Sequence, residues 1–249
     1  MAKKKKEFKV PNGKNWFYGL VKAIGLFKIV AKKPEIINLA GEIEQKSIVV
    51  VNHSNKSGPP GLNLYYPKTT CKWGAYQMFG NYKSRKAYLR DILYIQKCGK
   101  KPGFKTSFIA SVLGFLNPGI YKGMRMMPSD PDMRLAQTIK NSCKVLDAGL
   151  GVMIFPENSN EGYKDVLTEF FPGFVMLAEQ YYRSTGVDVP VYPVYYSVKK
   201  HVMVIDKPVF VQDLVKQGLN RKQIAEFYCN KVNDLYLNYV INYEPPKKK

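Results

Sequence analysis

The stretch Ser47-Ile48-Val49-Val50-Val51-Asn52-His53-Ser54 decides the fold that the sequence predicts. Its run of β-branched apolar residues is typical of a short strand buried inside a sheet. Residues 54–61 are small, polar or rich in glycine and proline, which predicts a loop after this strand. His53 therefore opens a loop at a strand end, where α/β proteins place reactive groups, and its imidazole suits proton transfer near neutral pH. A histidine in this position can also simply hydrogen bond the neighbouring backbone, so both roles stay open.

Predicted strands and helices alternate along the rest of the chain. A second buried strand is predicted at 151–155, followed by the polar loop 156–163. The other predicted strands are 69–77, 189–196 and 201–210, and the predicted helices are 81–95, 129–149, 168–183 and 220–241. This alternation predicts an α/β domain whose mixed, partly parallel sheet is flanked by helices. The loops after residues 51 and 155 would then leave strand carboxyl ends and could meet.

The charge balance restricts the partners. The chain has 39 Lys+Arg against 19 Asp+Glu, a formal net charge of +20, which favours polyanions such as an anionic membrane, phosphorylated substrates or nucleic acid. Residues 68–105 contain one acid, Asp91, among many cations and aromatic residues, a mixture that suits lipid headgroups or a nucleic acid strand. The cations are Lys68, Lys72, Lys83, Arg85, Lys86, Arg90, Lys97, Lys100, Lys101 and Lys105. A basic, solvated face without a partner is the alternative.

Two apolar segments have the character of interfacial helices. Residues 16–30 begin with aromatic side chains and follow a lysine-rich arm, and residues 107–121 form a second apolar segment. Either could instead be an ordinary buried helix. No apolar run reaches the roughly 20 residues that span a bilayer, and the first segment lacks the cleavage site of a secretory signal. We therefore expect a basic arm at 1–15, an interfacial amphipathic helix at 16–33, one α/β domain at 34–243 and a basic tail at 244–249.

The cysteines offer no metal or redox motif. Cys71, Cys98, Cys143 and Cys229 are scattered, without Cys-x-x-Cys spacing and far in sequence from either histidine. We expect no metal site, and four separate thiols fit a reducing compartment better than a disulfide framework.

Three ordered motifs resemble a known family. Asn52-His53 after one strand, Phe155-Pro156-Glu157 after another, and residues 189–194 are similar, in order, to signature blocks of the glycerolphosphate and lysophosphatidate acyltransferases. Residues 204–209 resemble that family's last core strand, so the similarity runs from about Ser47 to Phe210. The loop ending Glu161-Gly162-Tyr163 is similar to a divergent subgroup of the family.

The resemblance implies a reaction. His53 would act as general base on a hydroxyl of a glycerol phosphate or lysophospholipid, and the oxygen would attack an acyl thioester or acyl phosphate directly. The substrate-binding residues implied or suggested by position are Ser54, Arg125, Phe155, Pro156, Glu157 and Asn158. No cofactor is expected beyond the co-substrate, which would be acyl-CoA, acyl carrier protein or acyl phosphate. The enzyme would be a peripheral protein of the cytoplasmic face of an anionic membrane, with acyl carrier protein as a possible partner.

The motifs also depart from the family pattern. The family's aspartate five positions after the histidine is Gly58 here, and the glycine after Phe-Pro-Glu is Asn158. Glu157, Glu161 or Asp165 could replace the aspartate, and Glu161 is our first choice because the neighbouring Gly162 permits an unusual turn. The family's strand arginine aligns with Ser129, and Arg125, four residues earlier, could substitute. Two alternatives remain: a catalytically inactive relative that binds lipid as a scaffold, and, less favoured, a nucleic-acid-binding protein.

Overall fold

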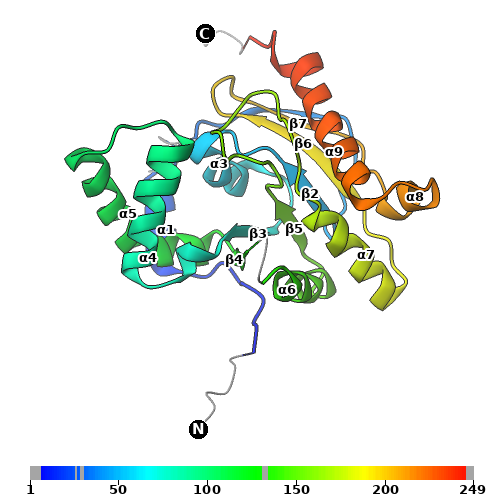
Figure 1. The fold of residues 1–249 in the computed structure, drawn as a ribbon, viewed down its shortest axis with the longest axis horizontal. Coiled ribbons are helices and arrows are strands. Elements are labelled where there is room, and N and C mark those ends of the chain that lie inside the picture. The colour runs from blue at the N-terminus through cyan, green and yellow to red at the C-terminus, as the bar shows by residue number, and fades with distance from the viewer. Residues whose placement is uncertain (1–6, 26, 29–30, 131–133, 245–249) are drawn as a thin grey trace.

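The computed structural model describes residues 7–25, 27–28, 31–130 and 134–244 (Figure 1). Its centre is a seven-stranded sheet in the order β1-β7-β6-β2-β5-β3-β4. The strands are β1 (Glu35–Asn38), β2 (Ile48–Val51), β3 (Thr70–Ala75), β4 (Met126–Ser129), β5 (Gly151–Ile154), β6 (Val191–Ser197) and β7 (Val202–Ile205). The α-helices are α1 (Trp16–Ala23), α3 (Gly58–Tyr65), α4 (Tyr82–Ala87), α5 (Phe104–Gly123), α6 (Leu135–Asp147), α7 (Gly173–Thr185), α8 (Val211–Lys216) and α9 (Arg221–Leu235). The 3-10 helices are η1 (Asn55–Ser57) and η2 (Tyr76–Phe79), and the π-helices are η3 (Tyr88–Lys97) and η4 (Tyr236–Val240).

The sheet is mixed and partly parallel, as predicted, and most of its strand pairings are parallel. β2 lies between β5 and β6 and pairs with both in parallel, with Ile48 opposite Val152 on one side and Val191 on the other. The pairing of β6 with β7 is antiparallel, so β7 and β1 run against the other five strands. Because β2 and β5 are parallel neighbours, the loops that follow them emerge at the same edge of the sheet.

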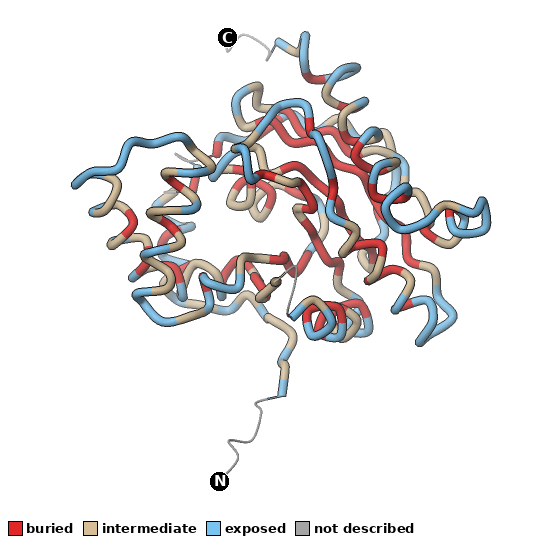
Figure 2. Tube along the Cα trace, in the orientation of Figure 1, coloured by how far each residue is buried: buried red, intermediate tan, exposed pale blue. Residues whose placement is uncertain are grey.

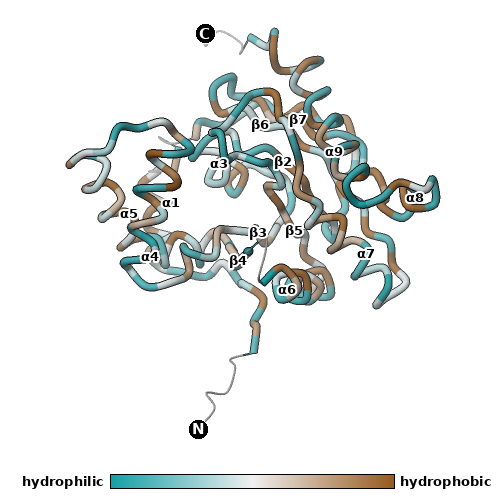
Figure 3. The backbone as a smooth tube through the Cα atoms, viewed as in Figure 1, coloured by the Kyte–Doolittle hydropathy of each residue, from teal (hydrophilic) through white to brown (hydrophobic). Residues whose placement is uncertain are grey.

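Successive residues of the central strands point alternately into two hydrophobic cores, one on each face of the sheet. Ile48 and Val50 point into the larger core, which the helices α6, α7 and α9 cover. Val49 and Val51 point into the second core, where Leu62 of α3 packs. The buried residues follow the central strands in Figure 2, and apolar stretches of the tube lie both in the sheet and in the surrounding helices in Figure 3. A strand buried on both faces explains why β2 reads as an unbroken apolar run.

A separate group of helices, α1, α4 and α5, lies at the left of Figure 1, away from α6, α7 and α9. α1 covers only the first part of the helix predicted at 16–33: it ends at Ala23, Gly25 follows with a positive φ of 74° that breaks the helical path, and Phe27 and Lys28 are helical again. Residues 26, 29 and 30 of that segment lie outside the described residues. Within the described part of the chain, no helix is long and apolar enough to cross a membrane.

The loop predicted at 54–61 is largely helical, which corrects that prediction. η1 occupies Asn55–Ser57 and α3 begins at Gly58. Pro59 and Pro60, which argued for a loop, stand in the first turn of α3, where a missing N–H and a fixed φ are tolerated. The predicted start of the helix at 129–132 falls partly on residues 131–133, outside the described residues, and α6 itself begins at Leu135.

Candidate active site

The backbone on both sides of His53 is fixed to the end of β6. The side chain of Asn52 accepts a hydrogen bond from the Tyr196 N–H (2.8 Å) and donates one to the Tyr196 carbonyl (3.0 Å). Ser54 Oγ accepts from the Val198 N–H at 2.9 Å. Ser54 therefore has a structural hydrogen bond where the sequence suggested substrate binding. Ser54 and Asn55 both adopt left-handed backbone angles, with φ of 46° and 64°, so the chain turns sharply just after the histidine.

The His53 ring packs against aromatic rings of the segment that follows β5, residues 155–163. It stacks on Phe155, with ring centroids 4.5 Å apart and planes inclined by 20°, and lies 5.1 Å from the ring of Tyr163. Its Nδ1 atom is buried and has no hydrogen-bond partner among the described residues. Burial, reinforced by the nearby Lys97 ammonium, lowers the pKa of His53 to about 3. The imidazole is therefore uncharged at neutral pH, and a pKa this low also makes it a weak base unless a nearby anion stabilises the imidazolium.

Glu157 is the carboxylate that contacts His53. Its Oε2 accepts a hydrogen bond from the main-chain N–H of His53 at 2.8 Å, and only 7% of the residue is exposed. Burial raises the pKa of Glu157 to about 7, while the His53 N–H bond and the charge of Lys97 act to lower it. The carboxylate thus joins the two loops, and it does so through the backbone of His53, since no hydrogen bond connects it to the ring.

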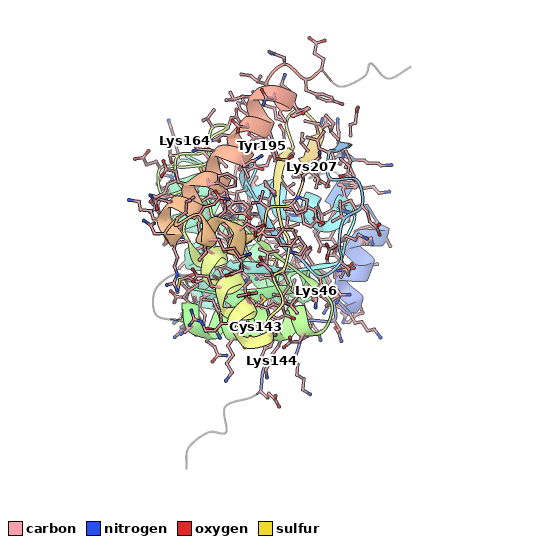
Figure 4. The ribbon with its side chains drawn as sticks, turned by 90° about the vertical axis from the view of Figure 1, so that its right-hand side faces the viewer. Lys46, Cys143, Lys144, Lys164, Tyr195 and Lys207 are labelled. Carbon is pink, nitrogen blue, oxygen red and sulfur yellow. The ribbon has the colours of Figure 1, made fainter. Side chains whose placement is uncertain are left out.

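Glu161 does not occupy the position that the sequence suggested. Its side chain is 82% exposed and pairs with Lys164 at 2.6 Å, and this hydrogen bond and charge lower the pKa of Glu161. Lys164 lies at the periphery of the molecule in Figure 4. Asp165 is also exposed, and its main-chain carbonyl accepts a hydrogen bond from Tyr195 (2.8 Å). Glu157 is therefore the only one of the three suggested carboxylates for which the structure gives a contact with His53.

The place of the family's aspartate is closed by the backbone. A Cβ atom added at Gly58 would lie 1.7 Å from the carbonyl oxygen of His53 and 2.7 Å from its carbonyl carbon. No side chain fits there unless the main chain moves, because such an approach is far inside van der Waals contact. The missing aspartate therefore accompanies a different path of the chain between His53 and α3.

A lysine that the sequence did not single out lies beside both loops. Lys97, at the end of η3, donates from Nζ to Ser159 Oγ (2.6 Å) and lies 5.7 Å from the centroid of the Tyr163 ring. Burial lowers the pKa of Lys97, and the charge of Glu157 opposes that shift. Burial raises the pKa of the Cys98 thiol, and the positive charges of Lys56, Lys100 and Lys97 oppose that shift, so all three ammonium groups act at this position. In the sequence, the basic segment 68–105 indicated this region of the chain, but nothing in it distinguished Lys97 from the other lysines.

The remaining suggested residues do not converge on His53. Arg125 precedes β4 and faces the amino-terminal end of the sheet, where its Nη1 donates to the Pro11 carbonyl at 2.8 Å. It therefore cannot replace the family's arginine at the other edge. The Pro156 carbonyl accepts from the Phe171 N–H, and Asn158 Nδ2 donates to Glu169 Oε2 at 2.9 Å. Asn158 lines a separate polar hollow of about 780 Å³ that reaches α9.

The described residues contain no cluster of three or more histidine, cysteine, aspartate or glutamate side chains that could hold a metal ion.

Comparison with known proteins supports the fold. No protein-family model matches the chain, and no curated protein sequence matches it significantly. Among solved structures, the chain is similar to the 1-acyl-sn-glycerophosphate (LPA) acyltransferase PlsC from Thermotoga maritima, with a TM-score of 0.51 and 15% sequence identity. The similarity covers 89% of this chain and 89% of that one. The chain therefore shares the fold of that acyltransferase over most of its length.

Proposed function

We propose that the protein is an acyltransferase that moves a fatty acyl group from a thioester or acyl phosphate to a hydroxyl of a glycerol phosphate or lysophospholipid. The observation that carries the proposal is the position of the His53 ring. It lies at the carboxyl end of β2, uncharged at neutral pH, against Phe155 of the second loop. The shared fold with PlsC supports the same reaction class.

The proposed reaction needs a base and no covalent enzyme intermediate. Because Nδ1 is buried against the protein, a substrate hydroxyl can approach the ring only at Nε2. His53 takes the hydroxyl proton as the oxygen attacks the acyl carbonyl carbon, which forms a tetrahedral intermediate. The carbon–sulfur bond, or the carbon–oxygen bond of an acyl phosphate, then breaks. The imidazolium returns its proton to the leaving group, and His53 is neutral again.

Glu157 and the lysines have separate proposed roles. The Glu157 carboxylate holds the main chain of His53 and places negative charge near the imidazolium as it forms, which stabilises that cation. Lys97, Lys56 and Lys100 supply positive charge beside the His53 loop, where the family's arginine is missing. We assign the acceptor's phosphate to these lysines because ammonium groups bind phosphate oxygens by charge-assisted hydrogen bonds.

A panel of donors and acceptors tests the proposal. Purified protein is given acyl-CoA, acyl carrier protein or acyl phosphate with glycerol 3-phosphate or lysophosphatidate, and the ester product is measured. The His53→Asn variant should form almost no product. His201→Asn is the matched control, since His201 lies before β7 at a left-handed φ of 54° that asparagine tolerates. No product with any pair would favour the inactive lipid-binding relative, and salt-sensitive binding to oligonucleotides would favour the nucleic-acid alternative.

A further inference from the structure

α5 carries an exposed apolar row that the fold leaves uncovered. Phe104, Phe108, Val112 and Phe115 are 86, 58, 41 and 76% exposed, and their spacing of three and four residues places them on one face of the helix. The opposite face is the one that packs: Ala110, Gly114 and Asn117 are buried, and α4 lies there with Arg85 Nε donating to the Gly114 carbonyl at 2.8 Å. Three protruding phenylalanines in one row are typical of an interaction site.

The helix α1 extends this row. Gly119 and Gly123 continue the α5 row at intervals of four residues, and added Cβ atoms there would lie 2.8 Å from Phe17 Cδ1 and 2.0 Å from Tyr18 Cγ. α1 therefore packs on the carboxyl-terminal end of the same α5 face. The side of α1 that points away from this contact is itself apolar and exposed. It consists of Trp16, Leu20 and Ile24, which are 80, 52 and 66% exposed.

The surrounding charge selects the partner. Lys101 and Lys105 are exposed at the amino-terminal end of α5, and Lys22 and Lys28 are exposed on and after α1. The one acid in the segment 81–125, Asp91, is paired with Arg90 at 2.6 Å. An anionic surface would be attracted to such a border of lysines. A second copy of this chain would instead bring its own formal charge of +20 against the same charge.

The segment that leads into α5 also touches both loops of the candidate active site. Cys98 Sγ donates to Asn55 Oδ1 at 3.4 Å in the His53 loop, and Gln96 Nε2 donates to the Asn160 carbonyl at 3.2 Å in the Glu157 loop. The amino-terminal end of α5 follows only a few residues later. A surface held by α5 would therefore lie beside these two loops.

We propose that the outward rows of α5 (Phe104, Phe108, Val112, Phe115) and α1 (Trp16, Leu20, Ile24) form one docking surface for an anionic lipid bilayer. The aromatic and aliphatic side chains enter the interface, and the lysines at its border bind lipid phosphates. This deepens the proposed function, because a docked enzyme meets a lipid acceptor at the membrane. The docking itself depends only on the described surface and stands without catalysis.

The test is flotation with vesicles of phosphatidylcholine alone and of an equimolar mixture with phosphatidylglycerol. The wild-type protein should float with the anionic vesicles. The triple variant Phe104→Ser, Phe108→Ser, Phe115→Ser should partition at least about tenfold less, because burying one large apolar side chain already corresponds to a factor of that order. The matched control is Leu237→Ser, Tyr239→Ser, Ile241→Ser, which removes exposed apolar residues of 49, 39 and 41% exposure near the carboxyl terminus. The control should float as the wild type does.

A fluorescence measurement keeps the test decisive if the triple variant folds poorly. Phe108→Trp in a Trp16→Phe background places the one exposed indole on α5, because the remaining Trp73 is only 9% exposed. Anionic vesicles should shift the emission of the introduced tryptophan to shorter wavelength. An unchanged emission, or equal flotation of the α5 variant and the wild type, would overturn the proposal. A change in oligomeric mass, or loss of oligonucleotide binding, without a change in flotation would overturn it in favour of a protein or nucleic-acid partner.

The two proposals fail separately. His53→Asn should float as the wild type does, since His53 is no part of the docking surface. If flotation requires the α5 row while no acyl donor and acceptor give product, docking stands and the catalytic proposal falls.

Discussion

At the residue scale, the chemistry of the candidate site follows from what each side chain is buried against. The His53 ring loses its charge because it is enclosed by Phe155 and Tyr163 and lies near the Lys97 ammonium. The same enclosure raises the pKa of Glu157. The same buried environment therefore favours the neutral forms of both His53 and Glu157. It moves the pKa of Glu157 to about 7, within the pH range where an enzyme works.

A pH profile should report Glu157 and not His53. The rate of acyl transfer should rise with pH through about 7, the pKa of Glu157, because the carboxylate must ionise before it can stabilise the imidazolium. His53 should add no titration in that range, since its pKa is about 3. In Glu157→Gln we expect a lower rate and a flat profile, measured as kcat/KM against pH. An unchanged acid limb in that variant would assign the titration to another group.

Restoring the family's aspartate should damage this protein. Gly58→Asp forces a Cβ against the His53 carbonyl, so the start of α3 must move and we expect a loss of about 1–3 kcal/mol of stability or more. Acyl transfer should fall as well, because the His53 loop shifts. Gly103→Asp is the control: an added Cβ there meets nothing within 4 Å, so its thermal unfolding should stay close to that of the wild type. A Gly58→Asp protein as stable as the control would contradict the closed backbone.

Part of this residue-scale account could be predicted from the sequence. His53 and Glu157 stand directly after buried strands, and that placement predicted that their loops would meet. The carboxylate partner was predicted wrongly as Glu161, because a flexible neighbour such as Gly162 says nothing about where a side chain points. Lys97 could not be singled out among the other lysines of its segment, since its role depends on the turn that brings η3 beside Ser159.

At the scale of secondary-structure elements, apolar runs predicted the strands well and short or unusual segments poorly. β2, β3, β5 and β6 are fully or mostly buried, so their hydrophobic patterns were readable. β1 is a mostly exposed edge strand without such a pattern and was missed. α3 was taken for a loop because of its glycines and prolines. Strand order was also beyond reach, because it depends on crossovers between segments distant in sequence.

One buried lysine connects three of these elements. Lys72 of β3 is only 2% exposed, and its Nζ donates to Asn63 Oδ1 of α3 (2.8 Å) and to the Thr70 carbonyl (3.1 Å). Asn63 in turn donates to the hydroxyl of Tyr18 in α1. Among the described residues no carboxylate pairs with Lys72. Burial therefore lowers the pKa of Lys72 from 10.5 to about 7.

Stability should depend on pH through Lys72. Between pH 7 and 10.5 the unfolded chain keeps a proton on this amine that the folded protein releases, so raising the pH favours the folded state. The contribution has a slope of up to about 1.4 kcal/mol per pH unit. We expect the difference in unfolding free energy between the wild type and Lys72→Met to change with pH in this window. Lys83→Met, at an exposed position, should give a constant difference from the wild type. A constant difference for Lys72→Met as well would show that the amine stays charged in the folded state.

At the scale of the whole molecule, the proposed reaction and the proposed docking fall on different parts of the fold, the sheet and the outer helices. β2 and β5 hold the two loops at one edge, and α1, α4 and α5 form their own group beside them (Figure 1). The basic charge covers more than that group. Lys46, Lys144, Lys164 and Lys207 are spread over the view in Figure 4, which looks at the molecule from the side opposite that group. The net charge therefore predicted an anionic partner, but it could not predict which face of the molecule would bind that partner. The exposed apolar rows of α5 and α1 are the reason for the face that we propose.

The most direct test of the central claim compares acyl transfer by the wild type, His53→Asn and His201→Asn at a pH above 7, where Glu157 is ionised. A general base contributes about 100-fold to 10,000-fold to the rate, so His53→Asn should fall by at least the lower factor while His201→Asn keeps the wild-type rate. Equal rates for the wild type and His53→Asn would contradict the account, because the ring at the end of β2 would then take no part in the reaction.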